Sequence, residues 1–126
     1  MALSKILSLA VGSLLGGFAR YFLGGAVGSV MGTVFPFGTL AVNILGCFLI
    51  GFLSALTGDK FFLGPEAKLL LMTGFCGAFT TFSAFMLETD SLLKGGEALK
   101  AFLYIFLSLF AGLLFFRLGI FLGKLL

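Results

Sequence analysis

Four long apolar stretches are the feature that most constrains the fold of this 126-residue chain. They cover about residues 4–27, 37–57, 68–88 and 98–124. Each is close to or above the roughly 20 residues that an α-helix needs to cross the hydrocarbon core of a bilayer. Together they take up nearly the whole sequence. We therefore expect an all-α integral membrane protein, with residues 1–126 forming one domain of four transmembrane helices.

The composition agrees with a membrane protein and excludes several classes of function. Hydrophobic residues make up 60% of the chain and charged residues 10%, far from a soluble domain. There is no histidine, and both cysteines lie in apolar stretches without metal-ligand spacing. No nucleophile–base pair is visible, so we expect no enzyme activity. The net charge of +3 is scattered, so the expected partner is the lipid bilayer and not a nucleic acid.

The first stretch combines small residues with one cation. Gly12, Gly16 and Gly17 have the spacing that lets a second helix backbone approach closely. Arg20 lies a turn or two before the end of the stretch. It is either an interfacial anchor whose charged head reaches water, or a positive charge at the mouth of an anion route. The sequence alone leaves both interpretations open.

The second stretch carries an amide at membrane depth. Thr39 and Asn43 are four residues apart and share one helix face. An Asn inside an apolar helix is costly unless it has a partner. Asn43 either forms a helix–helix hydrogen bond, worth on the order of 1 kcal/mol in lipid, or donates to a permeating anion. Taken alone, it favours the helix–helix bond.

The third stretch contains the least lipid-like run of the chain, Gly74–Phe85. Gly74 and Gly77 weaken the helix, and the hydroxyls of Thr80, Thr81 and Ser83 can bond backbone groups freed by an interruption. Non-helical backbone at membrane depth is tolerated only where it is buried in protein or lines a polar cavity. The sequence therefore predicts a third helix that is broken at mid-membrane, with a site at the break.

A polar and aromatic stripe follows the predicted break. Thr81, Phe85 and Glu88 lie at positions i, i+4 and i+7, and Phe82 neighbours Phe85 on the same helix. Glu88 is either an ordinary interfacial charge, which is the favoured interpretation, or the outer end of a pathway. In the fourth stretch Tyr104, Ser108 and Gly112 repeat every four residues. They indicate small-residue packing with an aromatic-belt tyrosine, unless they line a polar route.

Three connectors, at about Ala26–Pro36, Gly58–Pro65 and Thr89–Glu97, join the stretches; the middle one carries Asp59 and Lys60. If the stretches alternate across the membrane, Lys and Arg are shared between both sides, so the positive-inside bias is weak. A weakly biased chain can insert in both orientations, and four helices enclose little of a pathway. We therefore expect a dual-topology, antiparallel homodimer.

Together these features resemble the Fluc (CrcB) family of fluoride channels. The resemblance rests on Gly17–Arg20, the Gly-Thr-Leu-Ala-Val-Asn run at 38–43, Gly74–Phe85 and Glu88, and it extends over the whole chain. It implies a fluoride-selective channel that exports fluoride passively down its electrochemical gradient. It also implies an antiparallel homodimer with two pores at the subunit interface, in a bacterial inner (plasma) membrane.

The resemblance further implies roles for particular residues. The family's pore phenylalanines match Phe82 and Phe85, its pore asparagine matches Asn43, and its polar track matches Tyr104 and Ser108. A structural sodium ion is expected at the dimer centre, held by the backbone carbonyls of Gly77 and Thr80. The chain departs from the family pattern at Ala84 and Gly112, where hydroxyl residues are common. The complete expected fluoride pathway consists of Thr39, Asn43, Thr81, Phe82, Phe85, Glu88, Tyr104 and Ser108, with Arg20 as a vestibule charge.

These residue types suit a small, strongly hydrated anion. Phenylalanine edges carry the positive part of the ring quadrupole, and amide or hydroxyl donors replace water without the tight binding of a fixed cation. Two alternatives stay open. A proton-coupled multidrug-type exporter of four helices needs a membrane-buried carboxylate, and the first stretch has no acidic residue. A non-transporting scaffold subunit leaves Asn43 and the threonine–phenylalanine run without a function, and physics alone leaves it open.

Overall fold

The structure is a computed structural model that describes residues 2–57 and 63–126; Asp59 and Lys60 lie outside the described residues. The described chain is all-helical, with α1 (Ala2–Met31), α2 (Phe37–Leu56), α3 (Pro65–Lys68), the π-helix η1 (Leu69–Cys76), α4 (Gly77–Phe79), α5 (Ser83–Lys94) and α6 (Ala98–Lys124). The segments α3, η1, α4 and α5 follow one another as a single third span. Four spans are long and apolar enough to cross a membrane, as predicted.

Two of the spans extend further toward the C-terminus than predicted. The first continues to Met31 instead of residue 27, so the predicted connector at Ala26–Pro36 shortens to residues 32–36. It ends at Gly32, whose positive φ of 86° is a conformation that glycine adopts without steric cost. The third span likewise runs through Glu88 to Lys94.

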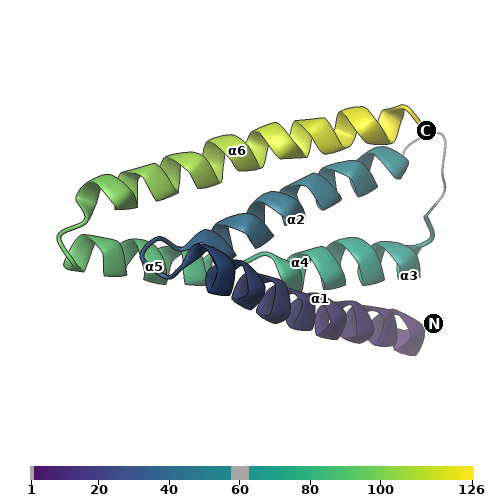
Figure 1. Cartoon of the computed structure of the whole chain (residues 1–126). Helices are drawn as coiled ribbons and strands as arrows, with labels where there is room; N and C mark the ends of the chain where they lie inside the picture. The colour runs from purple at the N-terminus through teal and green to yellow at the C-terminus, as the bar shows by residue number, and fades with distance from the viewer. Residues whose placement is uncertain (1, 58–62) are drawn as a thin grey trace.

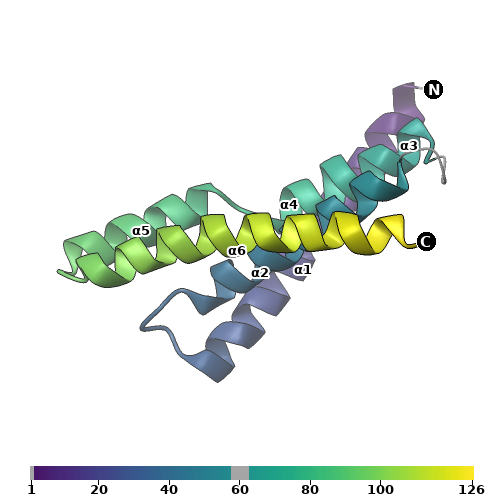
Figure 2. The same cartoon turned by 90° about the horizontal axis from the view of Figure 1, so that it is seen from above.

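The spans form two closely packed pairs (Figures 1 and 2). In the first pair α2 lies against α6, and α1 lies against η1 and α4 in the second. Both termini lie at one end of the molecule, and the α5–α6 turn lies at the other (Figure 1). Glycines allow backbone contact between α2 and α6. A Cβ at Gly51 would overlap the carbonyl oxygen of Phe116, and one at Gly119 would overlap that of Phe48.

The contact between α1 and η1 uses the small residues that the sequence pattern singled out. A Cβ at Gly12 would overlap the carbonyl oxygen of Leu70, and one at Gly16 would overlap that of Phe75. These two positions confirm the predicted close helix approach. Gly17 takes no part in it, because no atom of another described helix lies within 4 Å of its Cβ position.

The third span is broken, but not at its glycines. Gly74 lies within η1, and Gly77 is helical, with φ −63° and ψ −37°. The backbone becomes extended at Thr80, with ψ 159°, and the helix resumes at Ser83. We call residues 80–82 the break. Gly74 instead serves packing, because a Cβ there would lie 3.0 Å from the carbonyl oxygen of Leu9 on α1. The explanation of the break by flexible glycines is therefore wrong.

Candidate functional site

Asn43, on α2, forms two hydrogen bonds with the backbone at the break. Its Nδ2 donates to the carbonyl oxygen of Thr81 at 3.0 Å, and its Oδ1 accepts from the Thr81 backbone N–H at 2.8 Å. One side-chain amide thus satisfies both polar backbone groups of a residue that no helix can satisfy. The predicted bond between spans is confirmed, with the backbone of the third span as partner. An amide has two N–H donors, so one remains for another acceptor.

Of the three hydroxyls predicted to do so, those of Thr80 and Thr81 satisfy other backbone groups around the break. Thr80 Oγ1 donates to the carbonyl oxygen of Cys76 at 3.0 Å, alongside the Thr80 backbone N–H at 3.1 Å. On the far side of the break, the Ala84 backbone N–H donates to Thr81 Oγ1 at 3.2 Å. The Thr81 hydroxyl therefore caps the first turn of α5, where the N–H groups have no helical acceptor.

Arg20 ties α1 to the same region. Its Nε donates to the carbonyl oxygen of Ala78 at 3.2 Å. Ala78 belongs to α4, the short helix that stops just before the break, so its carbonyl is among those that a helix end leaves without a helical donor. Neither interpretation offered from the sequence, anchor or vestibule charge, included this contact. No pattern within the sequence links residues 58 positions apart.

Glu88, on α5, is held by two hydroxyl donors from other helices. Thr39 Oγ1 donates to Glu88 Oε1 at 2.7 Å, and Tyr104 Oη donates to Glu88 Oε2 at 2.8 Å. Glu88 is therefore not a simple interfacial charge surrounded by water. Tyr104 is 0% exposed, so assigning it to an aromatic belt was wrong. The three residues of this carboxylate network come from α2, α5 and α6.

The two phenylalanines of the predicted pathway differ in burial. Phe85 is 5% exposed and packs edge-to-face against Tyr104, with ring centroids 5.0 Å apart and planes at 83°. Phe82 is 70% exposed on the single chain and meets Phe85 at 5.9 Å and 71°. Both pairs have the edge-to-face geometry in which a ring edge points at a neighbouring face. The pair therefore runs from the interior of the chain to its surface.

A cavity of about 380 Å³ lies beside the break and is lined from α2, the third span and α6. We call it the uncharged cavity, because no Asp, Glu, Lys or Arg lines it. Ser108 Oγ is buried and has no hydrogen-bond partner, alone among the buried side-chain oxygens and nitrogens of the described residues. The predicted pathway residues at its wall are Asn43, Thr81, Phe82, Phe85 and Ser108.

A second cavity, of about 460 Å³, carries charge. Arg20 and Glu88 both line it, together with Thr39 and a glycine-rich wall from the facing ends of α1 and α2. We call it the charged cavity. Thr81 lines both cavities. The structure therefore brings the predicted site residues together in two adjoining groups, and Tyr104 lines neither cavity but holds Glu88.

The departures from the family pattern also have places in the structure. Ala84 lines the charged cavity. Gly112 is buried, and a Cβ there would lie 3.4 Å from Cys47 Sγ, which confirms its packing role between α6 and α2. Sequence reasoning missed that Cys47 and Cys76 line the uncharged cavity, because it treated both only as small apolar residues.

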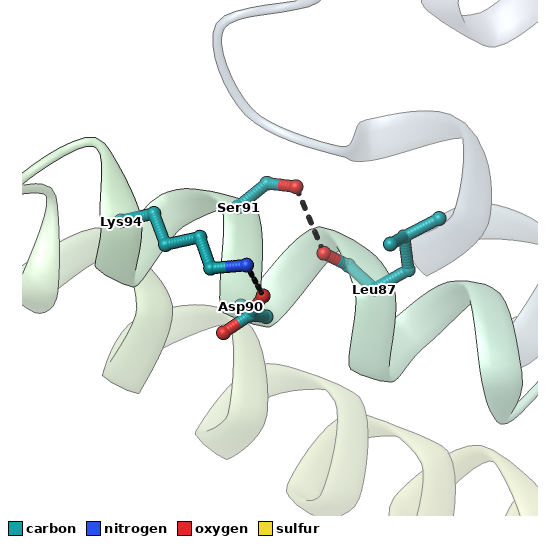
Figure 3. Close-up of polar contacts among 4 residues, drawn as sticks. All are labelled: Leu87, Asp90, Ser91 and Lys94. Carbon is teal, nitrogen blue, oxygen red and sulfur yellow. Dashed lines mark hydrogen bonds and ion pairs between the residues drawn. The ribbon is translucent and has the colours of Figure 1, made fainter.

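Further along α5 the polar contacts of Asp90, Ser91 and Lys94 are local and exposed (Figure 3). Lys94 Nζ lies 2.8 Å from Asp90 Oδ2, one helical turn away, and Ser91 Oγ donates to the Leu87 carbonyl at 2.9 Å. These bonds link no two helices, in contrast to those of Glu88.

Among the described residues, no group of three or more His, Cys, Asp or Glu side chains could hold a metal ion.

Comparisons with known proteins agree on one family. Residues 7–120 match the family described as "CrcB-like protein, Camphor Resistance (CrcB)". A relative from Chlorobaculum tepidum, named "Fluoride-specific ion channel FluC", is 50% identical over 125 residues, which cover 99% of this chain and 98% of the relative. A relative of the same name from Chlorobium phaeobacteroides is 49% identical, over 97% of this chain and 94% of its own length.

Proposed function

The chain belongs to the CrcB-like family, and we propose on this premise that it is a fluoride-selective ion channel that exports fluoride passively. The relatives that match it over nearly their whole length are named fluoride-specific ion channels. The name describes a channel and not an enzyme, so no residue is given a catalytic role. With four spans able to cross a bilayer, the chain is a multi-pass membrane protein.

The uncharged cavity is the observation that carries this proposal. It offers an anion several weak partners and no cationic side chain: an Asn43 N–H, the unpaired hydroxyl of Ser108, and the edges of Phe82 and Phe85. Removing the water of a small anion without replacement would cost on the order of tens of kcal/mol. Conduction needs replacement that is good enough for entry and weak enough for release. Neutral donors and ring edges meet both requirements.

We assign the charged cavity to the vestibule of the route. Arg20 provides a positive charge that raises the local anion concentration. The negative charge of Glu88 is partly offset by hydrogen bonds from Thr39 and Tyr104, which reduces its repulsion of an entering anion. Thr81 lies in the walls of both cavities, so it is the point where an ion passes from one to the other.

The proposed working unit is an antiparallel homodimer with two pores, in the inner membrane of a bacterium. Phe82 is 70% exposed on one chain although it borders the cavity, so a second copy is needed to complete the wall around it. Weak positive-inside bias supports insertion in both orientations. Pore residues at a wall that is open in a single chain favour pores at the subunit interface.

The backbone next to the break fits the structural sodium ion that the family resemblance implies. Gly77 is exposed, and Thr80 has left the helical conformation. Carbonyl oxygens of unwound membrane helices are suitable ligands for Na⁺. One chain provides two oxygens, at Thr80 in the extended backbone and at Gly77 in the short helix just before it, and a second copy would complete the coordination. A bound sodium ion would supply a fixed positive charge between the two pores.

Ion flux from liposomes tests the proposal. Purified protein is reconstituted in vesicles loaded with fluoride or chloride, and release is followed with ion-selective electrodes. We expect rapid fluoride release, weak chloride release, and loss of fluoride release in Phe82→Ile. No release from a folded dimer would contradict the channel and favour a scaffold. Fluoride release that requires a proton gradient would instead indicate a coupled exporter.

A further inference from the structure

We infer that Asn43 and Thr81 are positioning residues that free the carbonyls of Gly77 and Thr80 to bind a cation. The inference rests on the sodium site of the proposed function and explains how this chain creates it. The two side chains do so by accepting hydrogen bonds from the two backbone N–H groups that would otherwise donate to those carbonyls.

The Gly77 carbonyl is the first to lose its helical hydrogen-bond donor. In a continuous α-helix the N–H of residue i+4 donates to the carbonyl of residue i. The helical donor for Gly77 is therefore the N–H of Thr81. That N–H donates to Asn43 Oδ1 at 2.8 Å. The Gly77 carbonyl has lost its helical donor to a side chain of α2.

The Thr80 carbonyl loses its helical donor in the same way. Its helical donor is the N–H of Ala84, which donates to Thr81 Oγ1 at 3.2 Å. The Thr80 backbone is extended, with φ −88° and ψ 159°, so its carbonyl also points out of the helical register. Two side-chain oxygens thus take the two donors that belong to the expected sodium ligands.

Three neighbouring carbonyls, by contrast, have hydrogen-bond donors. The carbonyl of Cys76 accepts from the backbone N–H and the hydroxyl of Thr80. The carbonyl of Ala78 accepts from Arg20 Nε, and that of Thr81 accepts from Asn43 Nδ2. Side chains therefore supply donors to the carbonyls of Cys76, Ala78 and Thr81, and they accept the hydrogen bonds of the two N–H groups that a helix would direct to Gly77 and Thr80.

The freed oxygens suit a hard cation in an oxygen-rich site between two copies of the chain. Apart from its chain neighbours and the adjacent backbone of its own helix, no atom of the described chain lies within 4 Å of the Cβ position of Gly77, so a second copy can approach there. A Cβ at Gly46 of α2 would overlap the methyl group of Thr80. Gly46 thus lets α2 pack closely against the extended backbone.

Sodium binding to the purified full-length protein tests the inference without a flux measurement. Binding of ²²Na⁺ and the Na⁺-dependent rise in unfolding temperature are measured, with N-methyl-D-glucamine replacing Na⁺. Asn43→Leu removes the acceptor for the Thr81 N–H, and Thr81→Val removes the acceptor for the Ala84 N–H at nearly constant shape. We expect each change to weaken Na⁺ affinity about tenfold or more, because a carbonyl that regains a hydrogen bond must lose it again on binding.

Two matched variants serve as controls. Thr81→Ser keeps the hydroxyl acceptor and should restore the wild-type Na⁺ affinity that Thr81→Val loses. Ser108→Ala lies in the same cavity but bonds no backbone group, so it should also keep wild-type Na⁺ affinity. A merely structural role would not produce this pattern, because loss of folding would lower Na⁺ binding without regard to which acceptor is retained.

The outcomes separate this inference from the channel itself. Wild-type Na⁺ affinity in both Asn43→Leu and Thr81→Val overturns it, as does a wild-type protein that binds no Na⁺. If Asn43→Leu does not fold, Thr81→Val decides. Sodium binding that is sensitive to both residues, in a protein that releases no fluoride, supports the inference and contradicts the proposed function.

Discussion

The third span and α6 are comparable in length and apolar character, yet their backbone hydrogen bonds are satisfied in different ways. The helix α6 is continuous over 27 residues from Ala98 to Lys124. The third span covers 30 residues, from Pro65 to Lys94, and is interrupted at residues 80–82. Its backbone bonds are transferred to side chains from α1, α2 and the span itself. The difference teaches that a span can break at low cost when neighbouring helices provide the missing donors and acceptors.

The second helix connects the two kinds of span. One part of α2 packs against α6 through Gly51, with backbone close to backbone. Another part presents Asn43 to the break. A rigid contact on α6 thus fixes the helix that holds the interrupted backbone. Changes on the α6 side should therefore affect folding, whereas changes at the break should affect ion binding and flux.

The largest expected effect is on the α2–α6 contact. In Gly119→Leu the new Cβ would overlap the Phe48 carbonyl and lie 2.8 Å from the Phe52 backbone nitrogen. Backbone atoms cannot move aside cheaply, so we expect a loss of about 3 kcal/mol or more and little monodisperse protein in size-exclusion chromatography. Gly112→Ala is the control, because its Cβ meets only Cys47 Sγ at 3.4 Å. Equal recovery of both variants would contradict the proposed packing.

The second effect separates flux from stability at the break. Both Phe82→Ile and Phe85→Ile should lower fluoride flux at least about tenfold, because each removes a ring edge from the uncharged cavity. Only Phe85→Ile should also lower the unfolding free energy of the folded chain, by about 1–2 kcal/mol, because Phe85 is buried and Phe82 is exposed.

Phe102→Ile provides the control for both changes. Phe102 lies on α6, is exposed and lines neither cavity, so its replacement should leave fluoride flux as in the wild type. Unchanged flux in Phe82→Ile and Phe85→Ile would remove both residues from the pathway.

Sequence reasoning could predict the existence of the break but not its position. The run of glycines, threonines and phenylalanines is poor material for a lipid-facing helix, which is a local property. The position depends on Asn43, which is 38 residues away from Thr81 and bonds it only in the folded state. Gly74 and Gly77 remain helical for the same reason: in an apolar environment a helix yields where other groups can satisfy its backbone.

A third prediction concerns the carboxylate network. Tyr104→Phe removes the hydroxyl that donates to Glu88 Oε2 at 2.8 Å and keeps the buried ring. We expect a loss of about 1 kcal/mol, the usual penalty for leaving a part-buried acceptor with one partner fewer. Thermal unfolding in detergent measures the change. Tyr21→Phe is the matched control on an exposed tyrosine, and an equal midpoint for the two variants would show that the Tyr104 bond contributes nothing.

Tyr104 also marks a limit of prediction from sequence. Tyrosine near the end of an apolar stretch is typical of an aromatic belt. Its burial results from Phe85 and Phe35, whose rings pack against it at 5.0 and 5.5 Å, and from Glu88. All three contacts come from other helices or connectors. The spans themselves follow from length and hydropathy, but contacts between them do not.

The smallest expected effect is at the outer end of α5. Asp90→Asn removes the ion pair with Lys94, in which both side chains are mostly exposed (Figure 3). Exposed pairs one helical turn apart contribute little and are screened by salt. We expect no measurable change in unfolding midpoint at 0.15 M salt and none in fluoride flux. A clear drop in flux would place part of the pathway on this exposed face.

The most direct test of passive, selective fluoride conduction is the reversal potential of single dimers in a planar bilayer. Fluoride is set at unequal concentrations on the two sides, with chloride in excess and the pH equal. We predict a current that reverses near the equilibrium potential of fluoride and does not shift when a proton gradient is added. A reversal potential at the equilibrium potential of chloride, or one that shifts with the proton gradient, would contradict a fluoride-selective channel.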